Sequence, residues 1–246
     1  MRALVTGTSS GIGRATAERL VADGHEVVAT VRQVGQAPPG SREVVIDVRR
    51  PVPLAALGPF DAVVANAGVT NFCALEDLTD DELDEVFETN LLAPLRLVRA
   101  LLPDMRARGA GRLVVVSSQS AYLPTPFVAA YSGSKAGLEI AVESLAPEIR
   151  PFGILTTLVL PGATRTDMAR KAVRRVPPGS PYAAGAEATG ERCDGVIDGG
   201  VAPADVAAVI AEVLAMPHPP LRVVVGAETV RNIERFRPVD QRFLRG

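Results

Sequence analysis

A tyrosine and a lysine stand four residues apart in the segment YSGSK, and a serine precedes the tyrosine by thirteen residues. They are Tyr131, Lys135 and Ser118. Four residues are about one helical turn, so on a helix the ammonium and the phenol share one face. A positive charge beside a phenol lowers a pKa that is ordinarily about 10. The spacing predicts a tyrosine that exchanges a proton near neutral pH, although a half-buried ring beside a solvated lysine has the same spacing.

Short apolar runs provide the framework that must position these side chains. They lie at residues 3–5, 26–31, 43–46, 62–65, 113–116, 155–160 and 222–225. Helical periodicity separates them, which is typical of crossover connections and a parallel sheet. We therefore expect an α/β fold of Rossmann type, a doubly wound, seven-stranded parallel sheet with helices on both faces. Because no polar linker divides the 246 residues, we expect a single domain over 1–246.

A polar residue falls on the apolar face of a helix predicted over residues 80–108. Thr79 and Glu82 form a capping box at its start, and apolar residues then recur at three- and four-residue spacing. Asn90 lies in this stripe, where a buried amide bonded to backbone is one interpretation. Pro94 has no N–H for the carbonyl of Asn90, so we expect a disturbed helix and a carbonyl available to another partner.

Three glycines follow the first predicted strand and open a helical pattern. Gly7, Gly11 and Gly13 would permit a tight turn and a close approach of the backbone. The following helix would offer N–H groups and the positive end of its dipole to a pyrophosphate. Such glycines also occur in ordinary strand-to-helix turns, but their place after the first strand favours a dinucleotide site.

The end of the second predicted strand indicates which dinucleotide binds. NAD sites commonly have an acidic residue there for the ribose 2'-hydroxyl, whereas NADP sites need a cation for the 2'-phosphate. Here Val31 occupies that place and Arg32 follows it. Arg32 is suited to charge-assisted bonds with a phosphate, and Ser10 can add a hydroxyl. NADP(H) is favoured over NAD(H), and the alternative is that Arg32 is merely an exposed loop residue.

The order and spacing of these motifs resemble the short-chain dehydrogenase/reductase family across nearly the whole chain. The matching segments are TGTSSGIG at 6–13, NAG at 66–68, Asn90, Ser118, YSGSK at 131–135 and PGATRT at 161–166. The resemblance implies a catalytic tetrad of Asn90, Ser118, Tyr131 and Lys135. In it, Tyr131 would exchange a proton with the substrate oxygen and Ser118 would hydrogen-bond that oxygen. Lys135 would hold the nicotinamide ribose and lower the tyrosine pKa, and Asn90 would anchor a water in a proton relay.

The resemblance also implies how the cofactor is held. Asp47 and Val48 would meet the adenine, residues 66–68 the adenine ribose side, and residues 161–166 the nicotinamide amide. The full predicted set is Gly7, Ser9, Ser10, Gly11, Ile12, Gly13, Arg32, Asp47, Val48, Asn66, Ala67, Gly68, Tyr131, Lys135, Pro161, Gly162, Thr164 and Thr166.

Two departures from the family pattern are visible. Residues 49–60 are short and carry three prolines, so we expect the crossover there to be reduced to about a turn. Ala65 stands where many relatives have asparagine, which we expect to change strand packing more than chemistry.

Residues 167–202 lose the helical periodicity and carry six glycines between Gly179 and Gly200. A segment of this length within one domain is usually functional or disordered, and we interpret it as a substrate lid that is mobile without ligand. Its basic residues, Arg170, Lys171, Arg174 and Arg175, would suit an acidic substrate or, more simply, form a solvated helix face.

Composition excludes several function classes. Lys and Arg total 26 against 28 for Asp and Glu, a net charge of -2 that gives no basis for nucleic-acid binding. The two cysteines and two histidines form no metal-ligand pattern, so we expect reduced thiols and no metal site. Neither a leader pattern nor an apolar run of membrane-spanning length is visible, so we expect a soluble, cytoplasmic protein without a membrane partner.

We expect an NADP-dependent enzyme that reduces a small carbonyl compound or oxidises a secondary alcohol. The alternative is a dinucleotide-binding regulatory protein without turnover, which would need neither the Ser118 nor the Tyr131 hydroxyl. Dehydration or epimerisation would need a further acid or base that the motifs do not supply. By resemblance, helices at 80–108 and 130–149 would join subunits into a homodimer or homotetramer. The sequence does not identify the substrate.

Overall fold

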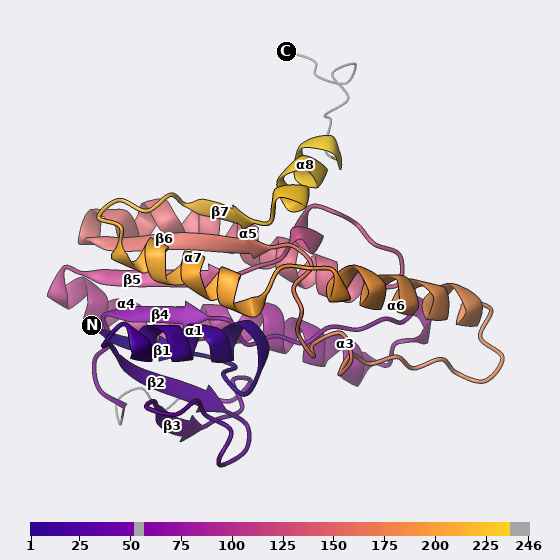
Figure 1. Ribbon diagram of the computed structural model, residues 1–246, viewed down its shortest axis with the longest axis horizontal. Coiled ribbons are helices and arrows are strands. Elements are labelled where there is room, and N and C mark those ends of the chain that lie inside the picture. The colour runs from indigo at the N-terminus through magenta and orange to yellow at the C-terminus, as the bar shows by residue number, and fades with distance from the viewer. Residues whose placement is uncertain (52–56, 237–246) are drawn as a thin grey trace.

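A single seven-stranded parallel sheet forms the centre of the computed structural model, which describes residues 1–51 and 57–236 (Figure 1). The strand order is β3-β2-β1-β4-β5-β6-β7. The strands are β1 (Arg2–Val5), β2 (Glu26–Val31), β3 (Arg42–Val45), β4 (Ala62–Ala65), β5 (Gly111–Val116), β6 (Ile154–Pro161) and β7 (Arg222–Val225). The predicted Rossmann-type fold is confirmed, and each strand lies within two residues of its predicted place.

Helices cover both faces of this sheet, and Figure 1 shows its strands one above another with helices in front of and behind them. Successive strand residues point to opposite faces, so Ala3 and Val5 of β1 pack in one core and Leu4 packs in the other. The first core contains α1 and α7, and the second contains α4 and part of α5. These helices are α1 (Gly11–Ala22), α7 (Pro203–Ala215), α4 (Ala93–Arg108) and α5 (Ala129–Ile149).

The winding direction of the sheet reverses between β1 and β4. The chain proceeds outward from β1 to β2 and β3, and then returns so that Ala62 of β4 pairs with Ala3 of β1. In such sheets the loops after the two central strands leave toward opposite faces. They thereby form the crevice in which ligands bind.

The predicted helix over 80–108 is interrupted where proline required it. It comprises α3 (Asp80–Phe87), a π-helical turn at Glu88–Leu92, and α4. Pro94 cannot donate to the carbonyl of Asn90. In the widened turn, the N–H of Ala93 instead donates to the carbonyl of Glu88, five residues earlier. The predicted disturbance of the helix is confirmed, as is the capping box of Thr79 and Glu82.

The segment 167–202, here called the lid segment, is more regular than predicted. It contains α6 (Ala183–Asp198), so the interpretation that helical periodicity is lost is wrong over these residues. Two α6 glycines serve close packing: a Cβ at Gly185 would lie 2.6 Å from the ring of Phe127, and one at Gly190 would lie 2.9 Å from Arg174. Glycines that allow close packing add no apolar side chain, so they do not contribute to an apolar periodicity in the sequence.

The remaining described elements are short turns and a projecting helix. The turns are η1 (Leu75–Asp77), η3 (Gln119–Ala121) and η4 (Arg150–Phe152), and α8 (Ala227–Phe236) points away from the sheet (Figure 1). The predicted short crossover falls partly on residues 52–56, and the arginine-rich tail ends with residues 237–246, all outside the described residues. None of the helices in the described ranges is long and apolar enough to cross a membrane.

Candidate active site

The loop between β1 and α1 has the geometry of a phosphate-binding turn. Gly7 and Gly11 have φ of +71° and +60°, a left-handed conformation that glycine adopts without strain. A Cβ at Gly13 would overlap the carbonyl oxygen of Gly7, so only glycine fits there. The N-cap Ser10 makes no side-chain capping bond within this described loop, which leaves the first-turn N–H groups of α1 for another acceptor.

The loops after β1 and β4 are bonded to each other, which brings residues 66–68 beside the glycine loop. Asn66 donates its Nδ2 to the Thr6 carbonyl at 3.0 Å. Thr6 Oγ1 accepts from the backbone N–H groups of Asn66 at 2.9 Å and Ala67 at 3.0 Å. A Cβ at Gly7 would lie 2.8 Å from Ala67 Cα, and one at Gly68 would lie 3.2 Å from Asn90 Oδ1.

The residues predicted to meet the adenosine end lie at the carboxyl ends of β2 and β3. Arg32 is exposed directly after β2, and Ser9 is exposed in the glycine loop. Thr30 ties β2 to that loop, because its carbonyl accepts from Thr8 N at 3.0 Å. The structure therefore places Arg32, Ser9 and Ser10 at the same edge of the sheet.

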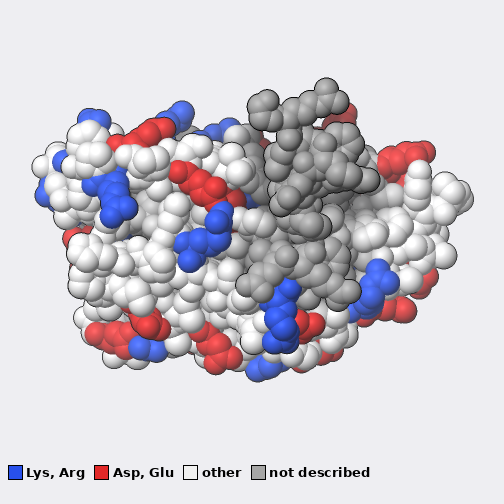
Figure 2. Space-filling model, turned by 90° about the horizontal axis from the view of Figure 1, so that it is seen from above, with Lys and Arg blue, Asp and Glu red and all other residues white. Residues whose placement is uncertain are grey.

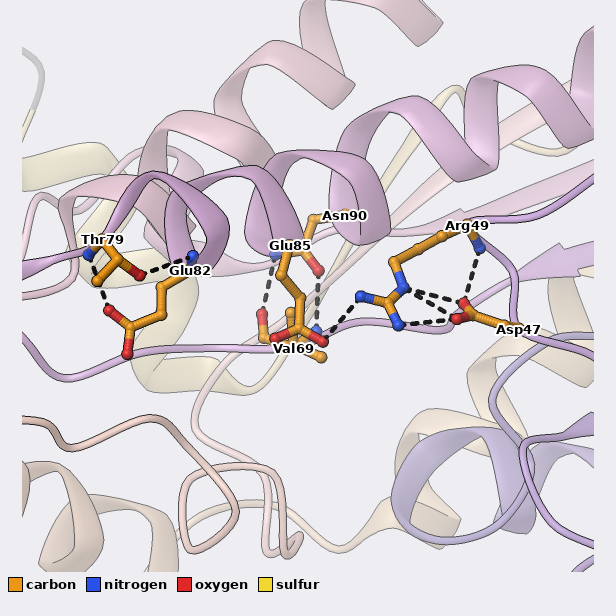
Figure 3. Close-up of polar contacts among 7 residues, drawn as sticks. All are labelled: Asp47, Arg49, Val69, Thr79, Glu82, Glu85 and Asn90. Atoms are coloured by element: carbon orange, nitrogen blue, oxygen red, sulfur yellow. Dashed lines mark hydrogen bonds and ion pairs between the residues drawn. The ribbon is translucent and has the colours of Figure 1, made fainter.

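Asp47 and Val48, predicted to lie near the adenine, follow β3. The Arg49 guanidinium lies 2.8 Å from the Asp47 carboxylate and holds its pKa below the usual range (Figure 3). Arg49 also pairs with Glu85 of α3 at 3.2 Å, which ties this loop to the helix. Val48 and Ala67 line one small cavity, so the two adenosine-side loops are neighbours.

The π-helical turn holds Asn90 in a fully buried position between two other elements. Its side chain exchanges two hydrogen bonds with the backbone of Val69, each 2.9 Å (Figure 3). Its Nδ2 also lies 3.1 Å from Ser134 Oγ, which in turn donates to the carbonyl of Tyr131 at 2.7 Å. Asn90 thus connects the loop after β4 to the helix that carries the tyrosine.

Ser118, Tyr131 and Lys135 meet where β5 ends. Tyr131 and Lys135 lie one turn apart on α5 and are 9% and 3% exposed. Lys135 Nζ donates to the carbonyl of Val116 at 2.9 Å. Ser118 follows two residues later, and its hydroxyl is near enough to the Tyr131 phenol to lower the pKa of that phenol. The helical spacing predicted for Tyr131 and Lys135 is confirmed, and the two hydroxyls converge.

The direction of the Tyr131 pKa shift is opposite to the prediction. Burial raises the pKa of this phenol, and the nearby Ser118 hydroxyl offsets only part of that effect. The ammonium of Lys135 is directed to the Val116 carbonyl, and burial lowers its own pKa to about 8. In this arrangement, Tyr131 is a protonated phenol at neutral pH, which is the form that donates a proton.

The loop after β6, predicted to meet the nicotinamide amide, closes the far side of this edge. Pro161 ends β6, and Thr164 donates its hydroxyl to the Gly162 carbonyl at 3.0 Å. A Cβ at Gly11 would lie 3.1 Å from Thr166 Cγ2, so this loop contacts the glycine loop. The structure therefore brings the predicted segments 6–13, 66–68 and 161–166 together.

The lid segment covers the tyrosine and is fastened by polar contacts. Tyr131 belongs to a buried cluster that includes Phe72 and Ala169, and Ile197 of α6 packs against it. Polar contacts fasten the segment to the η1 region, including Ser180 to Asp77 at 2.7 Å. Its basic residues pair with carboxylates: Arg170 with Asp198, Lys171 with Asp167, Arg174 with Asp194 and Arg175 with Glu82. The predicted solvated helix face is therefore wrong, because these four residues lie outside the helices.

Three residues that organise the site were missed from the sequence. Thr6 joins the loops after β1 and β4, Ser134 links Asn90 to α5, and Glu139 is a buried carboxylate one turn beyond Lys135. The helical spacing after Tyr131 places Glu139 on the same face, so this signal was available. Thr6 joins the ends of two strands that lie far apart in the chain, so no local sequence pattern predicts its role.

The geometry agrees with three comparisons. A family model described as short chain dehydrogenase matches residues 1–44 and 51–176. Human 17-beta-hydroxysteroid dehydrogenase type 1 is 36% identical over 190 residues, covering 68% of this chain and 58% of that protein. The 3-oxoacyl-[acyl-carrier-protein] reductase of Salmonella typhimurium is 35% identical over 183 residues, covering 68% and 75%. A short-chain dehydrogenase structure from Streptomyces avermitilis superposes with a TM-score of 0.81 at 36% identity, covering 95% of this chain and 90% of that one.

Proposed function

The chain belongs to the short-chain dehydrogenase family, and on this premise we propose that it transfers a hydride between NADP(H) and a carbonyl or secondary alcohol. The observation that carries the proposal is the convergence of the Ser118 and Tyr131 hydroxyls beside the buried ammonium of Lys135. A protein that only bound a dinucleotide would need none of this arrangement. The names of two relatives, a hydroxysteroid dehydrogenase and a 3-oxoacyl reductase, refer to substrates that carry the same hydroxyl or carbonyl groups.

The residues at the carboxyl edge of the sheet fit a nicotinamide dinucleotide. A glycine-only turn, uncapped N–H groups at the start of α1, and three loops in mutual contact form the cradle. Gly7, Gly11 and Gly13 would face the pyrophosphate, and residues 161–166 the nicotinamide. When bound, the nicotinamide supplies or accepts the hydride.

The chain's own residues handle the proton and the orientation of the substrate. In reduction, the protonated phenol of Tyr131 donates to the carbonyl oxygen, and Ser118 hydrogen-bonds the same oxygen and so positions it. Lys135 would hold the nicotinamide ribose through its buried ammonium. Asn90 contacts Ser134 of α5, and because Pro94 has no N–H for its carbonyl, Asn90 would anchor a water in a proton relay.

The test of the proposed function is NADPH oxidation in the presence of a panel of ketones, 3-oxoacyl thioesters and 17-ketosteroids. We expect turnover with at least one class and the reverse reaction with the matching alcohol. Tight NADPH binding with no turnover on any of them would favour the regulatory alternative.

We expect NADPH to bind more tightly than NADH because Arg32 can pair with the 2'-phosphate. Replacing Arg32 with alanine should weaken NADPH binding about tenfold or more while changing NADH binding little. Fluorescence titration of both cofactors measures this. Arg42→Ala is the matched control, since Arg42 is an exposed arginine at the opposite end of the β2–β3 pair. Equal affinities for the two cofactors in the original protein would contradict the preference.

We also propose that the chain forms a homodimer or homotetramer through α4 and α5. Ile140 of α5 is 65% exposed, which is high for a large apolar side chain on a helix. On the face shown in Figure 2, basic and acidic residues are interspersed among broad areas of other residues. Sedimentation at micromolar concentration should show an oligomer, and Ile140→Glu should shift it toward monomer. Val34→Glu, at an 82% exposed valine outside these helices, should have no effect.

A further inference from the structure

Glu139 is a buried carboxylate that the proposed reaction does not use. It lies on α5 in series with Tyr131 and Lys135, each four residues from the next, so the three side chains occupy one face of the helix. All three are buried, and Glu139 is 2% exposed. Burial of an ionised side chain is costly unless it is paired, so this position needs a reason.

The end of β5 and the two residues that follow it lie against this face of α5. The Ser118 hydroxyl is near the phenol of Tyr131, and the carbonyl of Val116 accepts from Lys135 at 2.9 Å. Between them in sequence, Ser117 donates its hydroxyl to Glu139 Oε1 at 2.5 Å. Residues 116–118 thus lie against the phenol, the ammonium and the carboxylate of one helix face.

Charges of alternating sign continue from Lys135 through Glu139 to the edge of the sheet. Arg222 of β7 lies 3.7 Å from Glu139 Oε2 and also pairs with Glu143, one further turn along α5. The guanidinium lies over the ring of Tyr122, 5.5 Å from its centroid, and Glu139 raises the pKa of the Tyr122 phenol. These groups, with Ser117, are the polar neighbours that face Glu139 from the described elements.

Lys135 itself has only a neutral acceptor within hydrogen-bond distance among the described residues. Its bond is to a backbone carbonyl, so its charge is not balanced by a direct ion pair. Glu139 is the carboxylate that acts on it, one turn away. Because both groups are buried, their attraction is screened less than between surface charges.

We propose that Glu139 is a positioning residue that keeps Lys135 protonated, and that Ser117 holds its carboxylate in place for this role. The inference rests on the proposed function, in which the ammonium of Lys135 serves the ribose and the proton donor. It adds a residue that does not touch the substrate and acts through Lys135. Burial lowers the pKa of Lys135 to about 8, although Glu139 acts in the opposite direction. Without the carboxylate, Lys135 would lose its charge near neutral pH.

Because the chain contains few lysines, the protonation of Lys135 can be measured directly. The sequence contains two lysines, Lys135 and Lys171, and Lys171 is an exposed residue beside Asp167. Protein labelled with ¹³C at the lysine ε-carbon therefore gives two signals, one buried and one a built-in reference. Their titration reports the protonation of Lys135 without cofactor or substrate, so it does not depend on whether the protein proves to be a reductase.

We expect Glu139→Gln, which preserves shape and the acceptor for Ser117, to lower the titration midpoint of Lys135 by about one pH unit. The alkaline limb of kcat/KM for reduction should move to lower pH by the same amount. Lys171 should be unchanged. Glu143→Gln is the matched control, since Glu143 shares Arg222 but lies two turns from Lys135, and it should shift the midpoint far less. An unchanged Lys135 midpoint in Glu139→Gln, or an equal shift in Glu143→Gln, would overturn the proposal.

A second variant should shift the titration midpoint of Lys135 in the opposite direction. Arg222→Gln removes a cation at a position that is 40% exposed, so it disturbs the core less than a change at Glu139. The carboxylate of Glu139 would then act on Lys135 without a competing positive charge, and the Lys135 midpoint should rise. A fall, or no change, would contradict the proposal even if Glu139→Gln fails to fold.

Discussion

Replacing Tyr131 with phenylalanine is expected to reduce the rate of ketone reduction by about 10²- to 10⁴-fold. The ring and its packing with Phe72 and Ala169 remain, and only the transferable proton is lost. NADPH affinity should therefore stay close to that of the original protein. Single-turnover reduction and a separate cofactor titration measure the two effects. Tyr182→Phe is the control, because Tyr182 is bonded to Glu76 on the exposed surface and should leave the rate unchanged.

The pH dependence follows from the directions of the two pKa shifts. Burial raises the pKa of Tyr131, so the phenol keeps its proton through the neutral range, as reduction requires. Lys135 has a pKa of about 8, so it loses its charge first as the pH rises. The rate of reduction should therefore decline above about pH 8. The residual rate of Lys135→Ala should not show this decline. A Tyr131→Phe variant with the original rate would show that another group is the acid.

Tyr131 and Lys135 should behave as one unit. Lys135→Ala is expected to lose turnover and also to weaken cofactor binding, because the ammonium would face the ribose. A variant carrying both substitutions should be scarcely slower than either single one, since residues that act together are not additive. Additive losses would show that the two residues serve separate steps.

Replacing Gly13 with alanine is expected to disable the cofactor site at its base. The added Cβ would overlap the backbone oxygen of Gly7 and the side chain of Asn66, so a shift of the backbone is required. We expect a loss of about 1–3 kcal/mol in the free energy of unfolding and at least a tenfold weaker binding of NADPH. Urea unfolding and fluorescence titration measure these changes.

The lid segment provides a control for the same substitution. A Cβ at Gly195, inside α6, meets nothing within 4 Å. Gly195→Ala should therefore stabilise the helix by up to about 1 kcal/mol and leave cofactor binding unchanged. A similar loss of NADPH binding in both glycine variants would show that the effect of Gly13 is not local to the turn.

The sheet was predictable because its central strands are buried between two layers of helices and so appear as short apolar runs. The break in the helix at Glu88–Leu92 was predictable as well, since a proline removes one donor at a known place. The glycines of the first loop, together with the strand before and the helix after them, indicated the site. In each case the signal was local in the sequence.

The features that escaped prediction depend on contacts between distant segments. The direction of the Tyr131 pKa shift is set by burial beneath the lid segment, which the spacing to Lys135 does not show. Helix α6 was obscured because its glycines fit against Phe127 and Arg174. The partners of Glu139 come from β5 and β7, and β7 lies more than eighty residues along the chain.

The all-parallel sheet also determines how late the candidate site can be completed during folding. Parallel neighbours cannot be joined by a hairpin, so each ladder must close a long loop before it gains any stability. One of the longest joins β6 to β7, where Leu158 pairs with Arg222. The strand that brings this arginine to Glu139 is the last to leave the ribosome, so we expect earlier strands to pair while the carboxylate still lies in water. The charged row behind the tyrosine would then close in the final step of folding, with the docking of β7.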